Sequence, residues 1–190
     1  MCYKRLQEIH PYYFFLPNQF WKHKNHIAVF KAILINKPND YIIICSGETF
    51  DHRDPSGDHF NMLEDFIFSN QLSKYIKILG PIPYNDVISL MMNSVAVINP
   101  SLFEGWSSSV EEAKSIHKDI ILSNIKVHLE QNPEFGHFFD PNNPKELSNQ
   151  LLYVFKNRNK KNPSFSLEKE TISFGNKALK IITDLGNNEN

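Results

Sequence analysis

Short apolar runs alternate with longer amphipathic stretches along this chain. The runs are rich in β-branched and aromatic residues and mostly lack polar interruptions, which is typical of parallel strands covered on both faces. The stretches between them repeat apolar residues at helical spacing. We predict strands at Tyr12–Leu16, Tyr41–Cys45, Tyr75–Leu79, Val95–Ile98 and Asp119–Leu122, with a weaker sixth at His137–Phe139. We predict helices at His26–Ile35, Phe60–Phe68, Asp86–Met92, Ser107–His117, Asn143–Asn157 and Leu167–Leu185.

This alternation predicts an α/β fold, a Rossmann-like, doubly wound parallel sheet of about six strands with helices on both faces. The chain has 190 residues, which is the size of one domain, and no repeat or internal linker divides it. We therefore predict a single domain over residues 1–190. Its core runs from about 12 to 158, followed by a C-terminal helix at about 166–185 and a polar tail at 186–190.

Charge and composition exclude several classes of protein. The formal net charge of −1 is not that of a nucleic-acid-binding domain, and the basic run at 156–161 is explained by a solvated helix end or loop. No apolar stretch reaches the roughly 18 residues of a membrane-spanning helix, and the N-terminus lacks the apolar core of a signal peptide. The cysteines Cys2 and Cys45 cannot form a disulfide framework, so a reducing cytoplasm is the expected location.

Ligands in such a sheet bind at the carboxyl ends of the strands, so the loops that follow the strands are the candidate sites. The first loop carries Lys22 and Lys24 just before a helix, an arrangement that attracts anions. An exposed loop whose aromatic pair, Phe20 and Trp21, packs on the domain edge explains the same residues equally well. Both interpretations stay open at this stage.

The next two loops give weaker signals. After the second strand, His52 and His59 are seven residues apart without a third metal ligand, which favours ordinary loop histidines. Arg53 lies in the same loop, where pairing with a neighbouring aspartate is favoured over contact with a phosphate. After the third strand, the stiff segment Gly80–Tyr84 is either a rigid turn or a backbone surface for a flat base.

The loop after the fourth strand is the most informative. A glycine turn at Gly105 leads into a helix that starts with three serines, which offers several donors to an anion. Glu104 and Glu112 are eight residues apart and bracket this helix start, where carboxylates suit sugar or ribose hydroxyls. A capping box, with Ser109 and Glu112 bonding each other's backbone, is an equally good explanation of Glu112 but does not explain Glu104.

The run Pro100–Ser115 (PSLFEGWSSSVEEAKS) resembles the glutamate–seven–glutamate motif of retaining GT-B glycosyltransferases of the family 4 type, the glycosyl transferases group 1. Other segments agree with that family in order and spacing, namely FLPNQFWKHKNH, CSGETFDHRDP, LGPIPYNDVISLM, ILSNIKVHLEQ and HFFDPNNPKEL. The resemblance covers roughly Tyr12–Leu152 and is to the C-terminal, donor-binding domain of those enzymes.

The resemblance implies a role for each matching residue. Lys24 would contact the donor diphosphate, Glu104 would be the catalytic residue near the transferred sugar, and Glu112 would bind the ribose hydroxyls. Gln19 stands where many members carry an arginine, which leaves Lys22 as the nearby candidate to supply that charge. No metal or cofactor is implied. The implied binding set for the nucleoside-diphosphate sugar is Gln19, Lys22, Lys24, Ile82, Glu104, Gly105, Trp106, Ser107 and Glu112.

The family's activity implies transfer of a hexose, with retention, from a nucleoside-diphosphate sugar to a glycan or lipid-linked acceptor in polysaccharide biosynthesis. It would take place in the cytoplasm or at the inner membrane face. Only eleven residues precede Tyr12, so we expect the acceptor-binding N-terminal domain to be missing, which leaves open whether the chain alone is an enzyme. The alternatives are a non-catalytic sugar-nucleotide-binding module, truncated or paired with a separate N-terminal-half subunit, and an unrelated phosphate-binding α/β domain.

Overall fold

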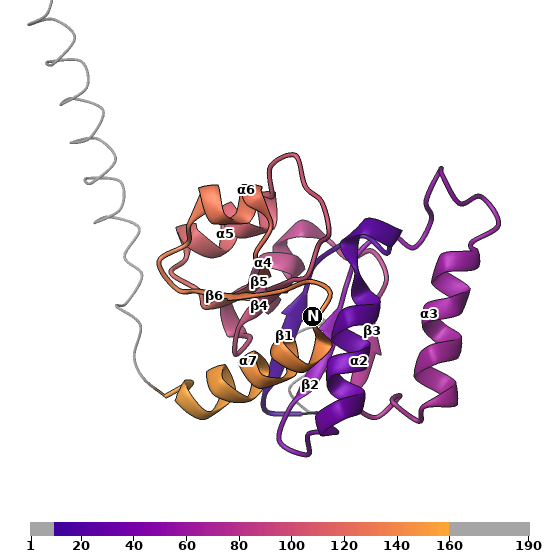
Figure 1. Cartoon of the computed structure of the whole chain (residues 1–190), viewed down its shortest axis with the longest axis horizontal. Coiled ribbons are helices and arrows are strands. Elements are labelled where there is room, and N and C mark those ends of the chain that lie inside the picture. The colour runs from indigo at the N-terminus through magenta and orange to yellow at the C-terminus, as the bar shows by residue number, and fades with distance from the viewer. Residues whose placement is uncertain (1–9, 160–190) are drawn as a thin grey trace, which may run out of the picture.

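Six parallel strands form the central sheet of the computed structural model, which describes residues 10–159 (Figure 1). The strand order is β3-β2-β1-β4-β5-β6, so the α/β doubly wound fold predicted from the sequence is confirmed. The strands are β1 (Tyr13–Leu16), β2 (Ile42–Cys45), β3 (Ile76–Ile78), β4 (Val97–Asn99), β5 (Ile120–Ser123) and β6 (Gly136–Phe139). The helices are η1 (Lys22–Lys24), α2 (His26–Asn36), α3 (Asp58–Ser69), α4 (Tyr84–Asn93), α5 (Ser108–Ser115), α6 (Lys126–Gln131) and α7 (Pro144–Asn157).

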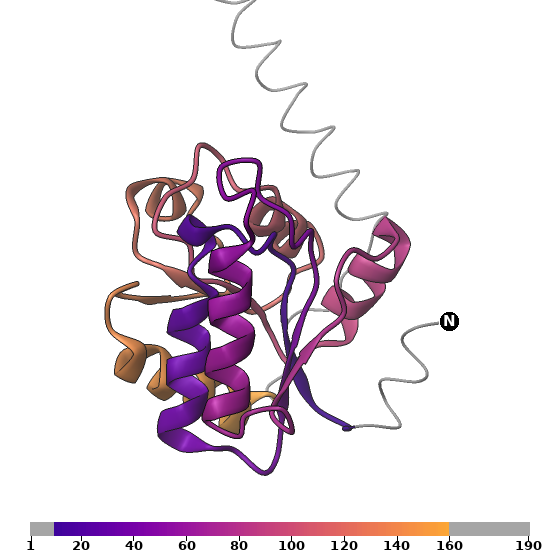
Figure 2. The ribbon, with the colours of Figure 1, turned by 90° about the vertical axis from the view of Figure 1, so that its right-hand side faces the viewer.

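Both faces of the sheet are covered, which explains why the strand sequences are continuously apolar. In β1 all four side chains are buried, and they alternate between the two faces. Phe14 and Leu16 join the core under α2, α3 and α7, whereas Tyr13 and Phe15 join the core under α4 and α5. Figure 2 shows α2 and α3 side by side on one face, with α4 on the opposite face. None of the helices in residues 10–159 combines the length and apolar character needed to cross a bilayer.

The order of the strands places the candidate site. β1 pairs with β2 on one side and with β4 on the other, and the chain reverses its direction of winding between β1 and β4. The loops that leave these two strands therefore separate toward opposite faces, and in folds of this kind the ligand crevice lies between such loops at the carboxyl edge of the sheet. Lys24 follows β1 and Glu104 follows β4, so both lie beside this crevice.

Some predicted boundaries were wrong. Helix α3 begins at Asp58 rather than Phe60, and α4 begins at Tyr84 rather than Asp86, because the first turns of both helices are largely polar or exposed. Helix α5 is shorter than predicted at both ends. The sequence analysis missed η1 and α6, and the two buried side chains of α6, His128 and Gln131, are both polar. The predicted helix at Leu167–Leu185 and the tail at 186–190 lie outside the described residues.

Candidate functional site

Lys24 and Glu104 form an ion pair at the switch point between β1 and β4. The Lys24 ammonium lies 2.7 Å and 2.9 Å from the two carboxylate oxygens of Glu104, and the two side chains are only 12% and 8% exposed. The hydroxyl of Ser101 donates a further hydrogen bond of 2.7 Å to the Glu104 carboxylate. The fold thus brings together two residues that are 80 positions apart in the sequence.

Asn99, at the end of β4, links the elements around this pair. Its side chain is fully buried. Its Oδ1 accepts from the amide of Asn18 at 3.3 Å and from the hydroxyl of Ser101 at 2.8 Å. Its Nδ2 donates to the hydroxyls of Ser107 at 2.7 Å and Ser109 at 3.1 Å. One buried amide therefore ties the loop after β1, the loop after β4 and the start of α5 to each other.

Asn25 holds the short helix that carries Lys24. It adopts a left-handed conformation (φ 56°) between η1 and α2, which asparagine tolerates better than most residues. Its buried Nδ2 donates to the carbonyls of Pro100 and Pro141, both at 3.0 Å. The backbone amide of Leu102 also donates to the carbonyl of His23 at 2.8 Å. The loop after β4 is therefore fastened to η1 on both sides of the ion pair.

The start of α5 excludes the capping-box explanation of Glu112. The helix begins after Ser107, and no side chain caps its first amides. Glu111 instead accepts from Gln131 at 2.9 Å and pairs with Lys114. Glu112 accepts a hydrogen bond of 3.1 Å from the hydroxyl of Tyr84. The first amides of α5 and the positive end of its dipole remain available to an anion at the crevice.

Tyr84 is a site residue that the sequence analysis missed. It stands at the start of α4, is 61% exposed, and reaches across to Glu112 on α5. The negative charge of Glu112, and then the hydrogen bond, raise the pKa of the Tyr84 hydroxyl. Ile82, two residues before Tyr84, packs against the core under α4 and α5. In the sequence, the only indication of this role is that Tyr84 is an aromatic residue at the end of the stiff segment Gly80–Tyr84, which follows the third predicted strand.

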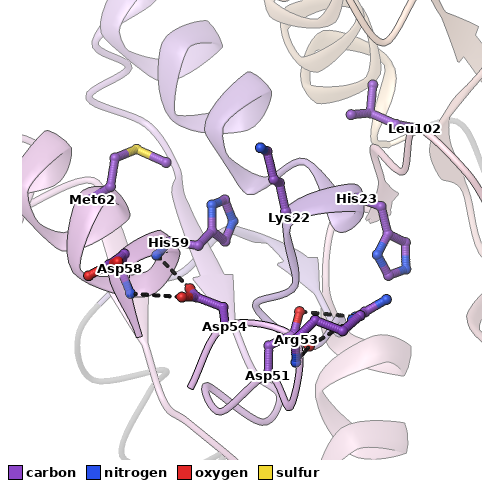
Figure 3. Close-up of a pocket in the computed structure, with 9 residues that line it drawn as sticks. All are labelled: Lys22, His23, Asp51, Arg53, Asp54, Asp58, His59, Met62 and Leu102. Atoms are coloured by element: carbon purple, nitrogen blue, oxygen red, sulfur yellow. Dashed lines mark hydrogen bonds and ion pairs between the residues drawn. The ribbon is translucent and has the colours of Figure 1, made fainter. Parts of the chain in front are cut away.

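None of the other predicted binding residues, all of which lie within residues 10–159, forms a hydrogen bond with the Lys24–Glu104 pair. Gln19 is exposed and makes no hydrogen bond to another described residue. Lys22 lines a separate cavity together with Arg53 and His59 (Figure 3). Gly105 and Trp106 are exposed in the loop after β4, while Ser107 is buried against Asn99.

The loop after β2 agrees with the simpler interpretation of its residues. Arg53 makes two hydrogen bonds to Asp51, at 2.8 Å and 3.0 Å, so its predicted pairing with a neighbouring aspartate is confirmed. His52 is exposed, and its ring contacts Phe50. Within residues 10–159, no three His, Cys, Asp or Glu side chains are grouped so that they could hold a metal ion.

Beneath the site, His26 is completely buried at the start of α2. Its ring stacks on Phe20 with the centroids 4.2 Å apart, and neither ring nitrogen has a hydrogen-bond partner of normal geometry. Burial lowers the pKa of this imidazole from 6.5 to about 3. The ring is therefore neutral at neutral pH and acts as an aromatic support for the loop after β1.

Comparison with solved structures supports the fold. The structures similar to this one include a glycosyltransferase from Rickettsia africae, with a TM-score of 0.72 and 21% identity over 82% of this chain and 42% of that protein. Another is HepE of Anabaena, solved in complex with UDP, with a TM-score of 0.74 and 17% identity over 84% of this chain and 43% of HepE. This chain therefore spans well under half the length of both proteins.

A third similar structure is the C-terminal domain of LpcC from Francisella tularensis, a glycosyl transferase group 1 family protein, with a TM-score of 0.65 and 20% identity over 77% of this chain and 76% of that domain. No curated protein sequence matches the chain significantly. The family model for glycosyl transferases group 1 matches residues 6–167, which is most of the chain. With the Rossmann-like fold of GT-B C-terminal domains, this match establishes that the chain belongs to the glycosyl transferases group 1 family.

Proposed function

We propose that this chain is the donor-binding half of a retaining glycosyltransferase of the family 4 type. It would transfer a hexose from a nucleoside-diphosphate sugar to a hydroxyl of a glycan or lipid-linked acceptor in polysaccharide biosynthesis. The observation that carries the proposal is the buried Lys24–Glu104 pair at the switch point, next to the uncapped start of α5. A cation, a carboxylate and free backbone amides are the groups that a sugar diphosphate requires.

Each group has a role in the proposed reaction. The diphosphate leaves the anomeric carbon with its negative charge near the Lys24 ammonium, the amides of Gly105, Trp106 and Ser107 just before α5, and the first amides of α5. Such preorganised donors stabilise the charge that develops on the leaving group, so the proposed transfer uses no metal or other cofactor. Glu104 is the proposed catalytic residue, and its carboxylate accepts hydrogen bonds from hydroxyls of the transferred sugar.

The nucleoside would lie on the α4 and α5 side of the crevice. There the carboxylate of Glu112 accepts hydrogen bonds from the ribose hydroxyls, and the backbone around Ile82 holds the base. In the structure the Tyr84 hydroxyl occupies one oxygen of Glu112, so the other oxygen remains available to a ribose. Gln19 and Lys22 would contribute to the diphosphate only after their side chains turn toward Lys24. We place the reaction in the cytoplasm or at the inner membrane face.

Calorimetric titration of the full chain with UDP, GDP and ADP tests this proposal. UDP is the first choice, because the similar protein HepE was solved with UDP. We expect one nucleotide to bind, and its 2′-deoxy analogue to bind about tenfold more weakly, since a charge-assisted hydrogen bond contributes on the order of 1.4 kcal/mol. Glu112→Gln should reduce that discrimination. Glu64→Gln, an exposed change on α3, is the matched control and should preserve it.

Two results would count against the proposal. If none of the three nucleotides binds, donor binding is wrong. If one binds but Glu112→Gln discriminates against the deoxy analogue as the native chain does, the assignment of Glu112 to the ribose is wrong.

We also propose a second function, a non-catalytic sugar-nucleotide-binding module or one half of a split enzyme. It differs from the first proposal because it requires this chain to bind the donor without carrying out the transfer by itself. Donor binding without transfer, even with a separate N-terminal-half subunit and a glycan acceptor present, would support the module. Transfer that appears only when the subunit is added would support the split enzyme.

A further inference from the structure

A cavity of about 800 Å³ lies on the α2 and α3 side of the carboxyl edge (Figure 3), and neither Glu104 nor Glu112 is among its lining residues. Its walls come from η1, from the loop between β2 and α3, and from the first turns of α3. The volume lies within the range of roughly 300–1,000 Å³ found for small-molecule sites. Its lining residues are Lys22, His23, Asp51, Arg53, Asp54, Asp58, His59, Met62 and Leu102.

Two of the three carboxylates in this cavity are already occupied by the protein. Asp51 accepts two hydrogen bonds from Arg53, at 2.8 Å and 3.0 Å. Asp54 accepts from the backbone amides of Asp58 at 3.3 Å and His59 at 2.7 Å, and thereby satisfies the start of α3. Asp51 and Asp54 therefore stabilise the loop between β2 and α3, and a ligand would have to bind to other polar groups of the cavity.

The remaining polar groups are a mixture of donors and acceptors. Within residues 10–159, the side-chain ammonium of Lys22 makes no hydrogen bond or ion pair, and the carboxylate of Asp58 accepts no hydrogen bond. The Nε2 atom of His59 is buried without a partner. Burial lowers the pKa of His59 and of His23, so both rings are neutral near pH 7 and each offers one donor and one acceptor.

This mixture identifies the chemical class of the ligand. Three carboxylates face two permanent cations, Lys22 and Arg53, so the cavity repels a multiply charged anion. It does not form a metal site, because no group of three ligating side chains exists among the described residues. Neutral hydroxyls both donate and accept, which matches the free groups. Met62 and Leu102 provide apolar surface for the C–H faces of a sugar ring.

The cavity adjoins the candidate donor site. Leu102 lines it and also lines a second cavity of about 420 Å³, whose wall includes Glu104 and Gly105 on one side and the segment at the start of α6 on the other. The backbone of Leu102 is hydrogen-bonded to His23, which lies in the wall of the larger cavity. We propose that the larger cavity is a second binding site, for a neutral saccharide, separated from the Glu104 site by Leu102.

Nuclear magnetic resonance spectra of the isotopically labelled full chain test this inference. The probes are maltose, lactose and glucose 6-phosphate, each added to roughly 10 mM, a concentration that fills about 90% of a site with a dissociation constant of about 1 mM. We expect at least one neutral disaccharide to shift the amide signals of residues 22–23 and 51–59. Met62→Trp places a large ring in the cavity and should weaken this binding at least tenfold.

Met92→Trp is the matched control, since Met92 is exposed on α4 and lies outside the cavity lining. It should leave saccharide binding unchanged, and both variants should bind nucleotide as the native chain does. If neither disaccharide shifts these signals, or if only glucose 6-phosphate does, the saccharide site is refuted, whether or not UDP binds.

Discussion

Replacing Asn99 by alanine tests how far one buried amide holds the candidate site together. The change removes three accepted hydrogen bonds, one from the amide of Asn18 and two from the backbone amide and hydroxyl of Ser101, and two donated ones, to Ser107 and Ser109. None of these side chains except that of Asn18 loses every partner. The hydroxyls of Ser107 and Ser109 lie 3.2 Å apart and can bond to each other.

The expected magnitude follows from this inventory. Each buried hydrogen bond contributes about 1 kcal/mol net, and an amide left without a partner costs a further 1–3 kcal/mol or so. Ser101 keeps its hydrogen bond to Glu104, which moderates the loss. We therefore expect Asn99→Ala to lower the free energy of unfolding by about 3–5 kcal/mol, a large fraction of the ~5–15 kcal/mol available to a typical domain.

Urea unfolding followed by circular dichroism measures this difference. Asn93→Ala is the control, because the Nδ2 of Asn93 donates only to the carbonyl of Ser89 on the exposed end of α4. That variant should lose less than about 1 kcal/mol. If Asn99→Ala loses no more than Asn93→Ala, the buried network does not hold the loops, and this account of the site is wrong.

Two further predictions concern stability. Because burial lowers the pKa of His26 from 6.5 to about 3, the unfolded chain binds a proton first as the pH falls, so stability decreases below pH 6.5. His26→Phe should remove about 2 kcal/mol of the loss between pH 7 and pH 5, and equal losses in both proteins would contradict this. Gly47→Ala should lower the free energy of unfolding by at least ~2 kcal/mol, because its Cβ would lie 2.4 Å from the Asn18 carbonyl oxygen. Gly105→Ala is the control, because its Cβ would meet nothing within 4 Å, and it should lose less than ~1 kcal/mol. If the two alanine variants unfold at similar thermal midpoints, the predicted clash of the Gly47→Ala side chain with Asn18 is wrong.

Most of the fold could be predicted from the sequence, because each strand is a short apolar run with its own local signal. Short helices without such a signal were missed. The six residues of α6 bury only His128 and Gln131, whose polarity gives no helical stripe. The three residues of η1 bury none of their side chains, so tertiary contacts through Asn25 decide their conformation.

Several residues of the candidate site could be predicted from the sequence one by one, but the contacts between them could not. Glu104 and Lys24 were candidates from their loops, yet only the strand order places them in contact. Asn99 carried a readable signal, a polar amide at the end of an apolar run, but its partners come from three different segments. The roles of Tyr84 and the larger cavity depend on side chains that converge only in the folded chain.

The close approach of Gly47 to Asn18 matters for protein engineering. Gly47 lies against the backbone of the loop after β1, and the amide of Phe20 donates to the carbonyl of Glu48 at 2.9 Å. Neither segment can change its path without displacing the other. A chimera that borrows residues 17–20 from another member of the glycosyl transferases group 1 family should therefore take residues 46–50 from the same relative, because the two loops have to be exchanged together.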